Sequence, residues 1–360
     1  MVFVFSSILM LDEGLKKTLV NTGDPNNVIV LRKGSDTEVQ SSIYRDQAAI
    51  IETMPMVSQS PMGGKFISKE AVVLITLMKK NAKQKSNVVV RGTSLNGFAL
   101  RPQVIITKGR KFTPGTNEIV IGSAIASGYT GTKIGDTLNF AQQEWTIVGI
   151  FSANKTAFDS EIWSPSDQLM QAFRRKNFSV LVFRNTESVD IRSIQEDLDS
   201  DPRLSQILKK EQEFYKDQSK ALSKFINILG LTLTIIFSIG ATIGAMITMN
   251  AAVASRTKEI GTLRAIGFKR REILTAFLIE SIMLASVGGA IGVTASTLME
   301  FSSFTTTNFQ TFADLSFGFV MTPEIALKSL FISSLMGCIG GAIPAFYAAN
   351  LTIVDSLRAN

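Results

Sequence analysis

Residues 252–272 of this chain read AVASRTKEIGTLRAIGFKRRE and lie between two long apolar runs. From Val253 to Glu272 the stretch contains six cations and two anions, which is a net charge of +4. The charged residues are Arg256, Lys258, Glu259, Arg264, Lys269, Arg270, Arg271 and Glu272. Lys and Arg beside membrane spans are retained on the inner side of the membrane. The stretch therefore predicts a cytoplasmic connection between two spans.

The apolar residues of this connection predict a short amphipathic helix. Ile260, Leu263 and Ile266 recur at helical spacing, and Gly267 follows at a position where helices commonly end. One face of such a helix can contact a membrane or another protein. The alternative is a basic loop that only sets topology and contacts lipid headgroups, and periodicity alone does not separate the two.

The same stretch carries the pattern A-x-x-x-R-T-x-E-I-G-x-L-R-A-I-G-x-x-R-x-x-I, from Ala252 to Ile273. This pattern resembles the coupling segment of the FtsX-like, MacB-type permeases of ABC transporters (type VII). The resemblance is specific over residues 225–360. It implies a permease subunit that works by mechanotransmission, in which a separate cytoplasmic ATPase moves the coupling helix and the motion reaches a domain outside the cell.

The composition excludes several kinds of active site. The chain has 360 residues, 45% of them apolar, and contains no histidine. Triads, metal sites and proton relays built on histidine are therefore excluded. The single cysteine, Cys338, excludes a disulfide within the chain and a cysteine-rich metal site. Four units of the net charge of +7 lie in the basic connection, so no nucleic-acid partner is predicted.

Three segments are long and apolar enough to cross a membrane. They are Phe225–Ala252 without a charge, Ile273–Met299 with Glu280, and Ile325–Ala349 with Lys328. The connection 300–324 has three acids and no Lys or Arg, which places it outside, opposite the basic connection. Residues 12–222 are then extracytoplasmic, and residues 350–360 form a cytoplasmic tail.

The apolar start of the chain, Met1–Leu11, is shorter than the roughly 20 residues that a spanning helix needs. It lacks the basic start and the cleavage site of a signal peptide. A partial first span, an interfacial anchor and a buried strand are the alternatives. The family resemblance favours a partial span with a truncated or misassigned start, and it predicts an α-helical membrane bundle of four spans.

Residues 12–222 contain no long apolar run and predict an α+β domain. Short runs rich in β-branched residues predict strands, and apolar residues at helical spacing predict helices. The predicted strands are Asn27–Arg32, Asn87–Arg91, Gln103–Thr107, Glu118–Ile121, Thr137–Phe140, Trp145–Phe151 and Ser179–Phe183, and the predicted helices are Val39–Thr53, Lys69–Lys80, Ser166–Lys176 and Val189–Asp199. The glycine-marked strands between Gly109 and Leu138 resemble the periplasmic core domain of MacB-type permeases. No G-x-x-x-x-G-K-[ST] or G-x-G-x-x-G nucleotide motif occurs.

Two charged stretches of this domain lead to separate predictions. Lys79, Lys80, Lys83 and Lys85 form a cationic patch, which is either a solvated helix end or a site for an anionic partner such as lipid headgroups or polyanionic cell-wall material. Residues 204–223 form a helical stalk that continues into the span at Phe225 without Pro or Gly. Residues 204–252 together predict one rod, roughly 73 Å long at 1.5 Å per residue, that can carry a movement across the bilayer.

Each predicted span contains two glycines four residues apart, which let helix backbones approach closely in lipid. These helix-packing residues are Gly240 and Gly244, Gly288 and Gly292, and Gly337 and Gly341. They predict a helix bundle or a dimer. Glu280 is the one acid within a span, and it is either part of a proton relay or an interfacial group that pairs with a nearby Arg or caps a neighbouring helix.

The resemblance also implies a binding site and its partners. Arg256, Lys258, Glu259, Arg264 and Gly267 are expected to contact the ATPase, with charges pairing across the interface and Gly267 allowing close approach or a helix end. ATP and Mg²⁺ would belong to that partner, and this chain is expected to hold no cofactor, metal or catalytic residue. A second permease copy or paralogue, a periplasmic adaptor and membrane lipids are further expected partners in a bacterial inner membrane.

Two functions are compatible with these features. The first is export or extraction of a substrate from the periplasm or the outer leaflet. The second is transmembrane signalling that activates an extracytoplasmic cell-wall hydrolase without moving a cargo. The predicted extracytoplasmic domain of about 210 residues, with two apparent subdomains, favours the first function.

Overall fold

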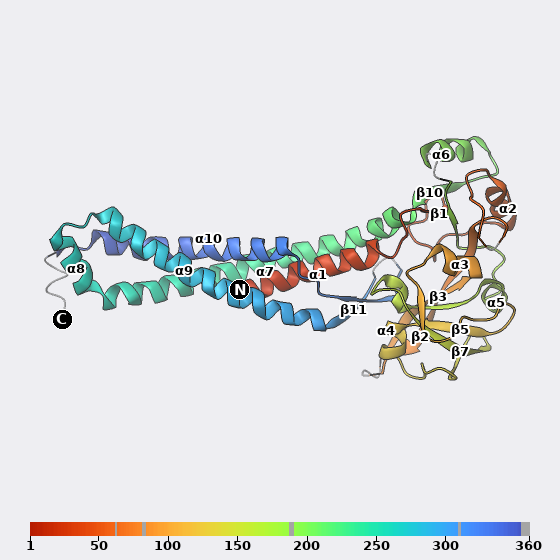
Figure 1. The fold of residues 1–360 in the computed structure, drawn as a ribbon, viewed down its shortest axis with the longest axis horizontal. Coiled ribbons are helices and arrows are strands. Elements are labelled where there is room, and N and C mark those ends of the chain that lie inside the picture. The colour runs from red at the N-terminus through yellow and green to blue at the C-terminus, as the bar shows by residue number, and fades with distance from the viewer. Residues whose placement is uncertain (62, 81–83, 187–190, 309–310, 354–360) are drawn as a thin grey trace. The chain divides into compact units, whose positions relative to one another are not determined.

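The computed structural model describes residues 1–61, 63–80, 84–186, 191–308 and 311–353. The chain divides into two compact units. The helical unit consists of Met1–Gly14, Lys224–Ser302 and Phe319–Asn360, and the α/β unit consists of Leu15–Ser223 and Ser303–Gly318. Figure 1 shows the elements of both units as a ribbon. Each unit is thus assembled from segments that lie far apart in the sequence.

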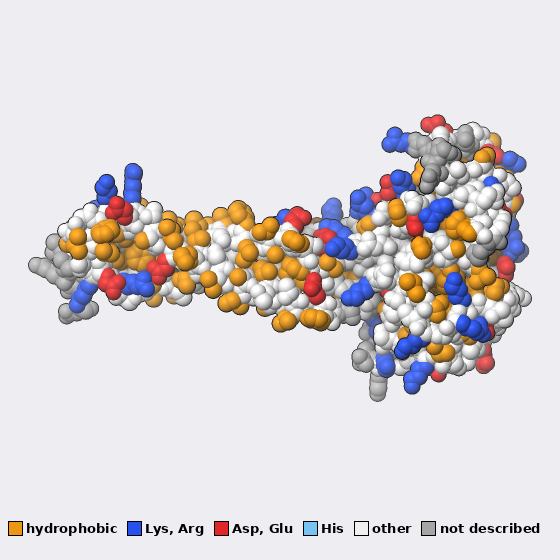
Figure 2. Space-filling model, viewed as in Figure 1, with side chains coloured by type: hydrophobic (Ala, Val, Ile, Leu, Met, Phe, Trp, Pro, Cys, Tyr) orange, Lys and Arg blue, Asp and Glu red, His pale blue; other side chains and the backbone are white. Residues whose placement is uncertain are grey.

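Long apolar helices make up the helical unit. Its elements are α1 (Val2–Val20), α7 (Glu211–Ser255), α8 (Thr257–Ile266), α9 (Arg270–Thr297), the 3-10 helix η2 (Leu298–Phe301) and α10 (Pro323–Asn350). The chain segments of α1 and α7 continue into the α/β unit. Three helical segments in the described part of the chain are long and apolar enough to cross a membrane, namely α7, α9 with η2, and α10. Hydrophobic side chains are spread along the visible surface of these helices, between stretches of backbone and other side chains (Figure 2).

The start of the chain differs from its prediction. Residues 2–20 form the single helix α1, which continues nine residues past Leu11. The buried-strand alternative is therefore wrong. The extension covers the stretch DEGLKKTLV, residues 12–20, which contains no proline, and its Leu, Lys and Glu residues have good helix propensity although Gly14 does not. α1 is not among the three helices that satisfy the length and hydropathy required of a span in the described part of the chain.

Helices α9 and α10 pack closely through small and hydroxyl residues. Ser281 Oγ donates a hydrogen bond of 2.7 Å to the Gly337 carbonyl, and Ser333 Oγ donates one of 2.6 Å to the Ala285 carbonyl. A side chain at Gly337 would collide with Ala285. This is the arrangement that small residues allow in lipid, where close packing and interhelical hydrogen bonds replace the hydrophobic driving force.

A mixed ten-stranded sheet forms the centre of the α/β unit. Its strand order is β10-β1-β9-β2-β3-β8-β5-β7-β4, and β6 pairs with β7 outside this path. The strands are β1 (Asn27–Arg32), β2 (Ile67–Met78), β3 (Lys85–Thr93), β4 (Ile105–Gly109), β5 (Glu118–Gly122), β6 (Thr137–Phe140), β7 (Gln143–Ser152), β8 (Glu161–Pro165), β9 (Val180–Arg184) and β10 (Gln206–Lys210). The pairs β3–β8 and β5–β7 are parallel, and the other pairs are antiparallel.

Shorter elements connect these strands. They are α2 (Arg45–Thr53), α3 (Leu95–Leu100), α4 (Ser123–Gly128), the 3-10 helix η1 (Ala157–Ser160), α5 (Ser166–Ala172) and α6 (Ile191–Ser200). A separate hairpin pairs β11 (Ser303–Thr307) with β12 (Asp314–Gly318) in antiparallel register. This hairpin lies in the connection 300–324, for which the sequence predicted only a loop.

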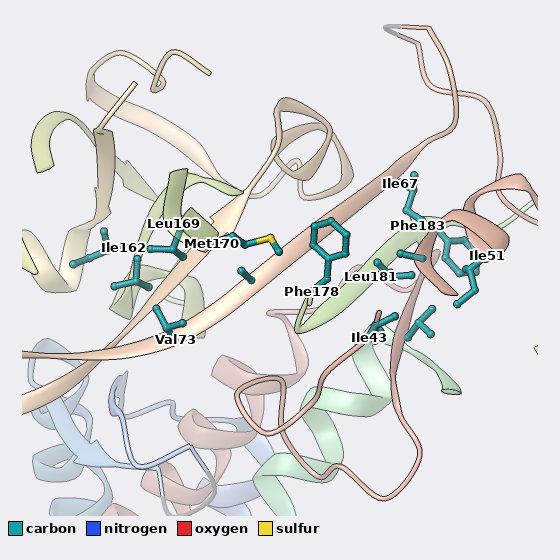
Figure 3. Packing of buried hydrophobic residues seen from close by; sticks show 14 of the residues in the cluster. Ile43, Ile51, Ile67, Val73, Ile162, Leu169, Met170, Phe178, Leu181 and Phe183 are labelled. Atoms are coloured by element: carbon teal, nitrogen blue, oxygen red, sulfur yellow. The ribbon is translucent and has the colours of Figure 1, made fainter. Parts of the chain in front are cut away.

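Two hydrophobic cores cover the two faces of the sheet. Along β1, Val28 and Val30 belong to one core, while Ile29 and Leu31 belong to the other. This alternation is the two-residue period of a strand buried on both faces. Figure 3 shows part of the first core, where Leu169, Met170 and Phe178 lie against the strands.

Every predicted strand has a counterpart in the α/β unit. The seven predicted strands correspond to β1, β3, β4, β5, β6, β7 and β9. The predicted helix Ser166–Lys176 corresponds to the shorter α5, and Val189–Asp199 to α6, with residues 189–190 outside the described part. The strand β8 was not predicted.

The prediction of a helix at Lys69–Lys80 is wrong, because these residues lie in β2 and just beyond it. The run Ala71–Ile75 is apolar throughout and has buried residues on both faces of the sheet, so its periodicity does not distinguish a strand from a buried helix. Its β-branched residues favoured the strand.

Two further helix boundaries differ from their predictions. Helix α2 begins at Arg45 and not at Val39, because Ile43 forms a β-bridge with Phe178. The predicted stalk helix begins at Glu211 and not at residue 204, because Gln206–Lys210 pairs with β1 as β10. The rod is therefore α7 alone, with 45 residues.

Candidate coupling site

The basic connection folds into α8, as predicted. Gly267 ends the helix in the left-handed conformation with φ of 116°, and the Phe268 N–H donates to the Leu263 carbonyl at 3.1 Å. This hydrogen bond closes a Schellman-type helix end, which favours glycine because glycine has no Cβ. The sequence prediction of a helix that ends at Gly267 is confirmed.

One apolar residue of α8 faces inward and the others face outward. Ile260 is 2% exposed and packs with Val253, Ile273 and Phe277 in a cluster that joins α7, α9 and α10. Leu263 and Ile266, by contrast, are 41% and 72% exposed. Ile260 therefore anchors α8 to the helical unit, while the next two apolar positions are available for contact.

Arg256 and Glu280 form an ion pair in the helical unit. Arg256 Nη1 donates to both carboxylate oxygens of Glu280, at 3.1 and 3.2 Å. Of the interpretations of Glu280 from sequence, the pairing with an arginine is the one that the geometry supports. The arginine is Arg256, which directly follows α7. It is not Arg270 or Arg271, which are closer to Glu280 in the sequence.

The five residues expected to contact the ATPase fall into two groups. Arg256 is paired with Glu280, and Arg264 Nη1 donates to the Ala349 carbonyl of α10 at 2.8 Å. Lys258, Glu259 and Gly267 are exposed on α8 or at its end. The two arginines therefore fasten α8 to α9 and α10, and the other three residues remain at the surface.

The glycine pairs also have different surroundings. A Cβ added at Gly337 or Gly341 would meet α9, and one at Gly292 would meet Val2 and Phe3 of α1. A Cβ added at Gly240, Gly244 or Gly288 would have no atom within 4 Å. Three of the six glycines thus pack within the helical unit, and the other three lie on open helix surface.

A cavity of about 510 Å³ lies in the helical unit beside some of these residues. Its walls are mostly apolar and small, and Glu280 is its one acidic lining residue. The lining includes Ala241, Ala245, Leu284, Gly288 and Met336.

Sequence analysis missed a cluster of six buried charged residues in the α/β unit. This buried arginine cluster consists of Arg91, Arg101, Glu38, Glu70, Glu161 and Glu211, each at most 6% exposed. Arg91 donates five hydrogen bonds of 2.7 to 3.0 Å to Glu38, Glu70 and Glu161. Such density of charge-assisted bonds is what a buried ion pair needs to offset its desolvation.

The buried arginine cluster holds the first residue of α7. Arg101 donates to Glu211 at 2.9 Å and to Glu70 at 2.6 and 3.1 Å. The remaining oxygen of Glu211 accepts from the Asp24 N–H and from Asn27 Nδ2. The α7 start is therefore bonded to the end of α3 and to β1 at once.

The pKa values of two glutamates in the cluster are shifted in opposite directions. Burial alone would raise the pKa of Glu70, but Arg101 and Arg91 outweigh burial and lower this pKa to about 2. For Glu161 the balance is opposite, because burial raises its pKa and Arg91 only partly offsets the effect.

No group of three or more His, Cys, Asp or Glu side chains that could hold a metal ion occurs in the described part of the chain.

The cluster left a weak signal in the sequence. Arg91 and Glu70 are charged residues at the ends of apolar runs, where a solvated strand end is the ordinary interpretation. The wrong helix at Lys69–Lys80 gave no reason to pair Glu70 with Arg91.

Family models match both parts of the chain. Residues 2–201 match the MacB-like periplasmic core domain, and residues 231–353 match the FtsX-like permease C-terminal domain.

Curated relatives match over most of this chain. The macrolide export ATP-binding/permease protein MacB of Haemophilus ducreyi is 24% identical over 376 aligned residues, which cover 97% of this chain and 51% of that protein. The protein of the same name from Campylobacter fetus is 28% identical over 270 residues, which cover 70% of this chain and 41% of that protein. The chain spans about half the length of the curated relatives that it matches, or less.

Two solved structures are similar to part of the chain. The periplasmic region of MacB from Actinobacillus actinomycetemcomitans matches with a TM-score of 0.41 and 10% identity, over 56% of this chain and 96% of that one. The extracellular domain of the noncanonical ABC-type transporter YknZ matches with a TM-score of 0.38 and 16% identity, over 51% of this chain and all of that one.

Proposed function

This chain belongs to the MacB-type, FtsX-like permease family, and from that premise we propose that it couples ATP hydrolysis by a separate ATPase to movement of its α/β unit. A MacB-like periplasmic core domain together with three apolar helices fits a membrane protein with an extracytoplasmic domain. We further propose that the chain lies in a bacterial inner membrane, with α1 as a fourth membrane-associated helix.

The observation that carries this proposal is the exposed side of α8. Lys258, Glu259, Leu263, Ile266 and Phe268 form what we call the coupling surface, and all five are exposed. Apolar side chains flanked by charges of both signs suit a protein partner, because the apolar groups supply binding energy and the charges set orientation. ATP and Mg²⁺ would be bound by that partner.

The proposed path from the coupling surface to the α/β unit runs along helix α7. Helix α7 is continuous from Glu211 to Ser255, roughly 68 Å at 1.5 Å per residue. Its first residue is bonded to Arg101 in the buried arginine cluster, and its last residue lies two positions before α8. A push on α8 would therefore be passed along one helix to a rigidly held end.

The proposed substrate is defined by where it lies and not by its chemical class. We propose export or extraction of a substrate from the periplasm or the outer leaflet, by an assembly with a second permease copy or paralogue and a periplasmic adaptor. The names of the curated relatives refer to macrolide export. Activation of a cell-wall hydrolase is the competing function, and it would require no cargo.

Stimulation of the ATPase tests the role of the coupling surface. The full chain is reconstituted in lipid nanodiscs with the ATPase that co-purifies from native membranes. Ile266→Asp, Glu259→Arg and Gly267→Trp are each expected to abolish ATPase stimulation while the protein still inserts. Ile266→Leu, which keeps an apolar group at the same position, is the matched control and is expected to retain stimulation.

Two outcomes would contradict the proposed function. Normal stimulation by Ile266→Asp would show that the ATPase docks elsewhere. Co-purification of a cell-wall hydrolase, with no cargo moved in reconstituted vesicles, would replace export by signalling.

A further inference from the structure

The connection between α9 and α10 is part of the α/β unit. The strand β11 begins at Ser303, directly after η2 and Ser302, and β12 ends at Gly318, five residues before α10 begins at Pro323. Residues Ser303–Gly318 cluster with the α/β unit, whereas the helices on either side belong to the helical unit. The chain therefore enters the α/β unit a second time between the last two candidate spans.

Asp314 is the centre of the polar contacts that hold this hairpin. It is 6% exposed. Its Oδ2 accepts a hydrogen bond of 2.8 Å from the Tyr129 hydroxyl and forms an ion pair with Lys79 Nζ at 2.5 Å. Lys79 follows β2, Tyr129 follows α4, and the two residues form a β-bridge with each other. Asp314, Lys79 and Tyr129, here called the Asp314 cluster, thus join three separate elements.

The contact explains part of the cationic patch. The Lys79 side chain is 29% exposed, and its anionic partner is Asp314 of the same chain. Lys79 is therefore not the solvated helix end that was one of the two predictions for the patch. Lys80 and Lys85 are described without an ion pair to Asp314, and Lys83 lies outside the described residues. Asn87, two residues after Lys85, adds a second polar contact because its Nδ2 donates to the Phe312 carbonyl at 3.1 Å.

Backbone and apolar contacts support the same docking. The Ser316 N–H donates to Ser160 Oγ of η1 at 3.1 Å. Leu315 and Phe317 are 4% and 3% exposed. A cavity of about 210 Å³, lined in part by Lys79, Tyr129 and Asp314, remains beside these contacts. Polar contacts and buried apolar side chains therefore hold the hairpin together.

Charge and register make Asp314 specific for this position. A buried carboxylate that loses its cation costs far more than an apolar residue would, so the hairpin is stable only where Lys79 and Tyr129 meet Asp314. A shift of the hairpin by one residue would turn Asp314 to the opposite face. The cluster therefore selects one docked arrangement.

We propose that the Asp314 cluster gives the α/β unit a second mechanical connection, through which movement of α9 and α10 reaches it in addition to movement of α7. This inference rests on the proposed function, because it concerns how motion that begins at α8 is divided. Helix α8 lies in the chain between α7 and α9, so a partner that moves α8 acts on both helices.

Hydrogen–deuterium exchange of the full chain in nanodiscs tests the docking without the ATPase. Asp314→Asn keeps the size of the side chain and removes its charge, and Lys79→Gln removes the cation. Each variant is expected to increase the exchange rate of the Ser316 amide by roughly tenfold or more, as loss of a charged hydrogen bond predicts. The double variant Lys79→Glu/Asp314→Lys, which swaps the two charges, is expected to restore part of the protection of the Ser316 amide. Glu118→Gln, which breaks the exposed ion pair with Arg110 on the same unit, is the control and leaves the Ser316 amide unchanged.

A second measurement tests the mechanical role. With the ATPase present, Asp314→Asn is expected to keep ATPase stimulation, because the coupling surface is intact, and to lower the substrate moved per ATP hydrolysed severalfold. Unchanged exchange at Ser316 would overturn the docking role of Asp314. Faster exchange with unchanged transport per ATP would overturn the mechanical role. Absence of any ATPase stimulation by the unsubstituted chain would instead contradict the proposed function, while the exchange data would still report on the cluster.

Discussion

Arg256 Nη1 lies 3.1 Å from Glu280 Oε1, and the pair joins the residue between α7 and α8 to the middle of α9. Helix α7 precedes α8 in the chain, and α9 follows it. The ion pair therefore closes the connection around α8 and limits how far α7 and α9 can separate. Its position beside the coupling surface makes it the first target for substitution.

Arg256→Ala and Glu280→Ala are expected to reduce ATPase stimulation by similar factors. The Arg256→Ala/Glu280→Ala double variant is expected to be no worse than either single one, because both remove the same interaction. Stimulation assays on the four proteins of this double-mutant cycle measure the coupling. Additive effects would show that the two residues act independently and that Glu280 has a separate role, such as a proton relay.

Gly337→Ala is expected to lower the thermal unfolding temperature of the helical unit. The added methyl group would collide with Ala285 at the close contact between α9 and α10. The destabilisation is expected to be about 1–3 kcal/mol. Gly240→Ala is the matched control, because a Cβ there meets no described atom within 4 Å beyond its own turns of helix. Equal effects of the two substitutions would contradict the packing of α9 on α10.

Arg101→Gln is expected to destabilise the α/β unit by about 3–5 kcal/mol, because it leaves Glu70 and Glu211 buried with too few cations. Denaturant unfolding followed by tryptophan fluorescence measures this change, since Trp145 and Trp163 are both buried in the unit. Arg110→Gln, at an exposed ion pair with Glu118, is the control and is expected to leave the midpoint unchanged. A midpoint that Arg101→Gln does not shift would show that the cluster contributes little to stability.

The stability of the α/β unit is expected to depend on pH in two opposite ways. The pKa of Glu70 is lowered from 4.5 to about 2, so its contribution to stability is present above pH 4.5 and is lost as pH falls towards 2. The pKa of Glu161 is raised above 4.5, so its contribution is present below pH 4.5 and is lost as pH rises through the raised value.

The same tryptophan unfolding assay, repeated across pH, separates the two acids. Glu161→Gln is expected to flatten the loss of stability on the high-pH side and to leave the acid side unchanged. Glu70→Gln is expected to destabilise the protein at pH 7 and to do so much less at pH 3. A Glu161→Gln variant with an unaltered pH profile would contradict the assignment.

The helical unit was predictable because its signals are local. A run such as Phe225–Ala252 contains no charge over 28 residues, and the helix end at Gly267 depends on residues within one turn. Strands such as Asn27–Arg32 were predictable for a similar reason, because β-branched runs between turn residues carry their own preference. The strand β2 was not, because a run buried on both faces loses the period that separates strand from helix.

The charged pairs that lie far apart in the sequence could not be predicted. Arg101 and Glu211 are 110 residues apart in the sequence, and Lys79 and Asp314 are 235 apart, yet each pair is bonded. Nothing local distinguishes these residues from solvated charges. Arg256 was expected from the family resemblance to contact the ATPase, and its observed partner is Glu280.

The sequence by itself determined where the apolar helices lie, where α8 ends and which family the basic connection resembles, because hydropathy, helix capping and short motifs are properties of neighbouring residues. The tertiary structure alone decided which charges are buried, which glycines are packed and which segments join the α/β unit. Those features depend on residues that approach one another only after the sheet has formed and the helices have packed. Burial then makes each such charge costly unless its distant partner is in place.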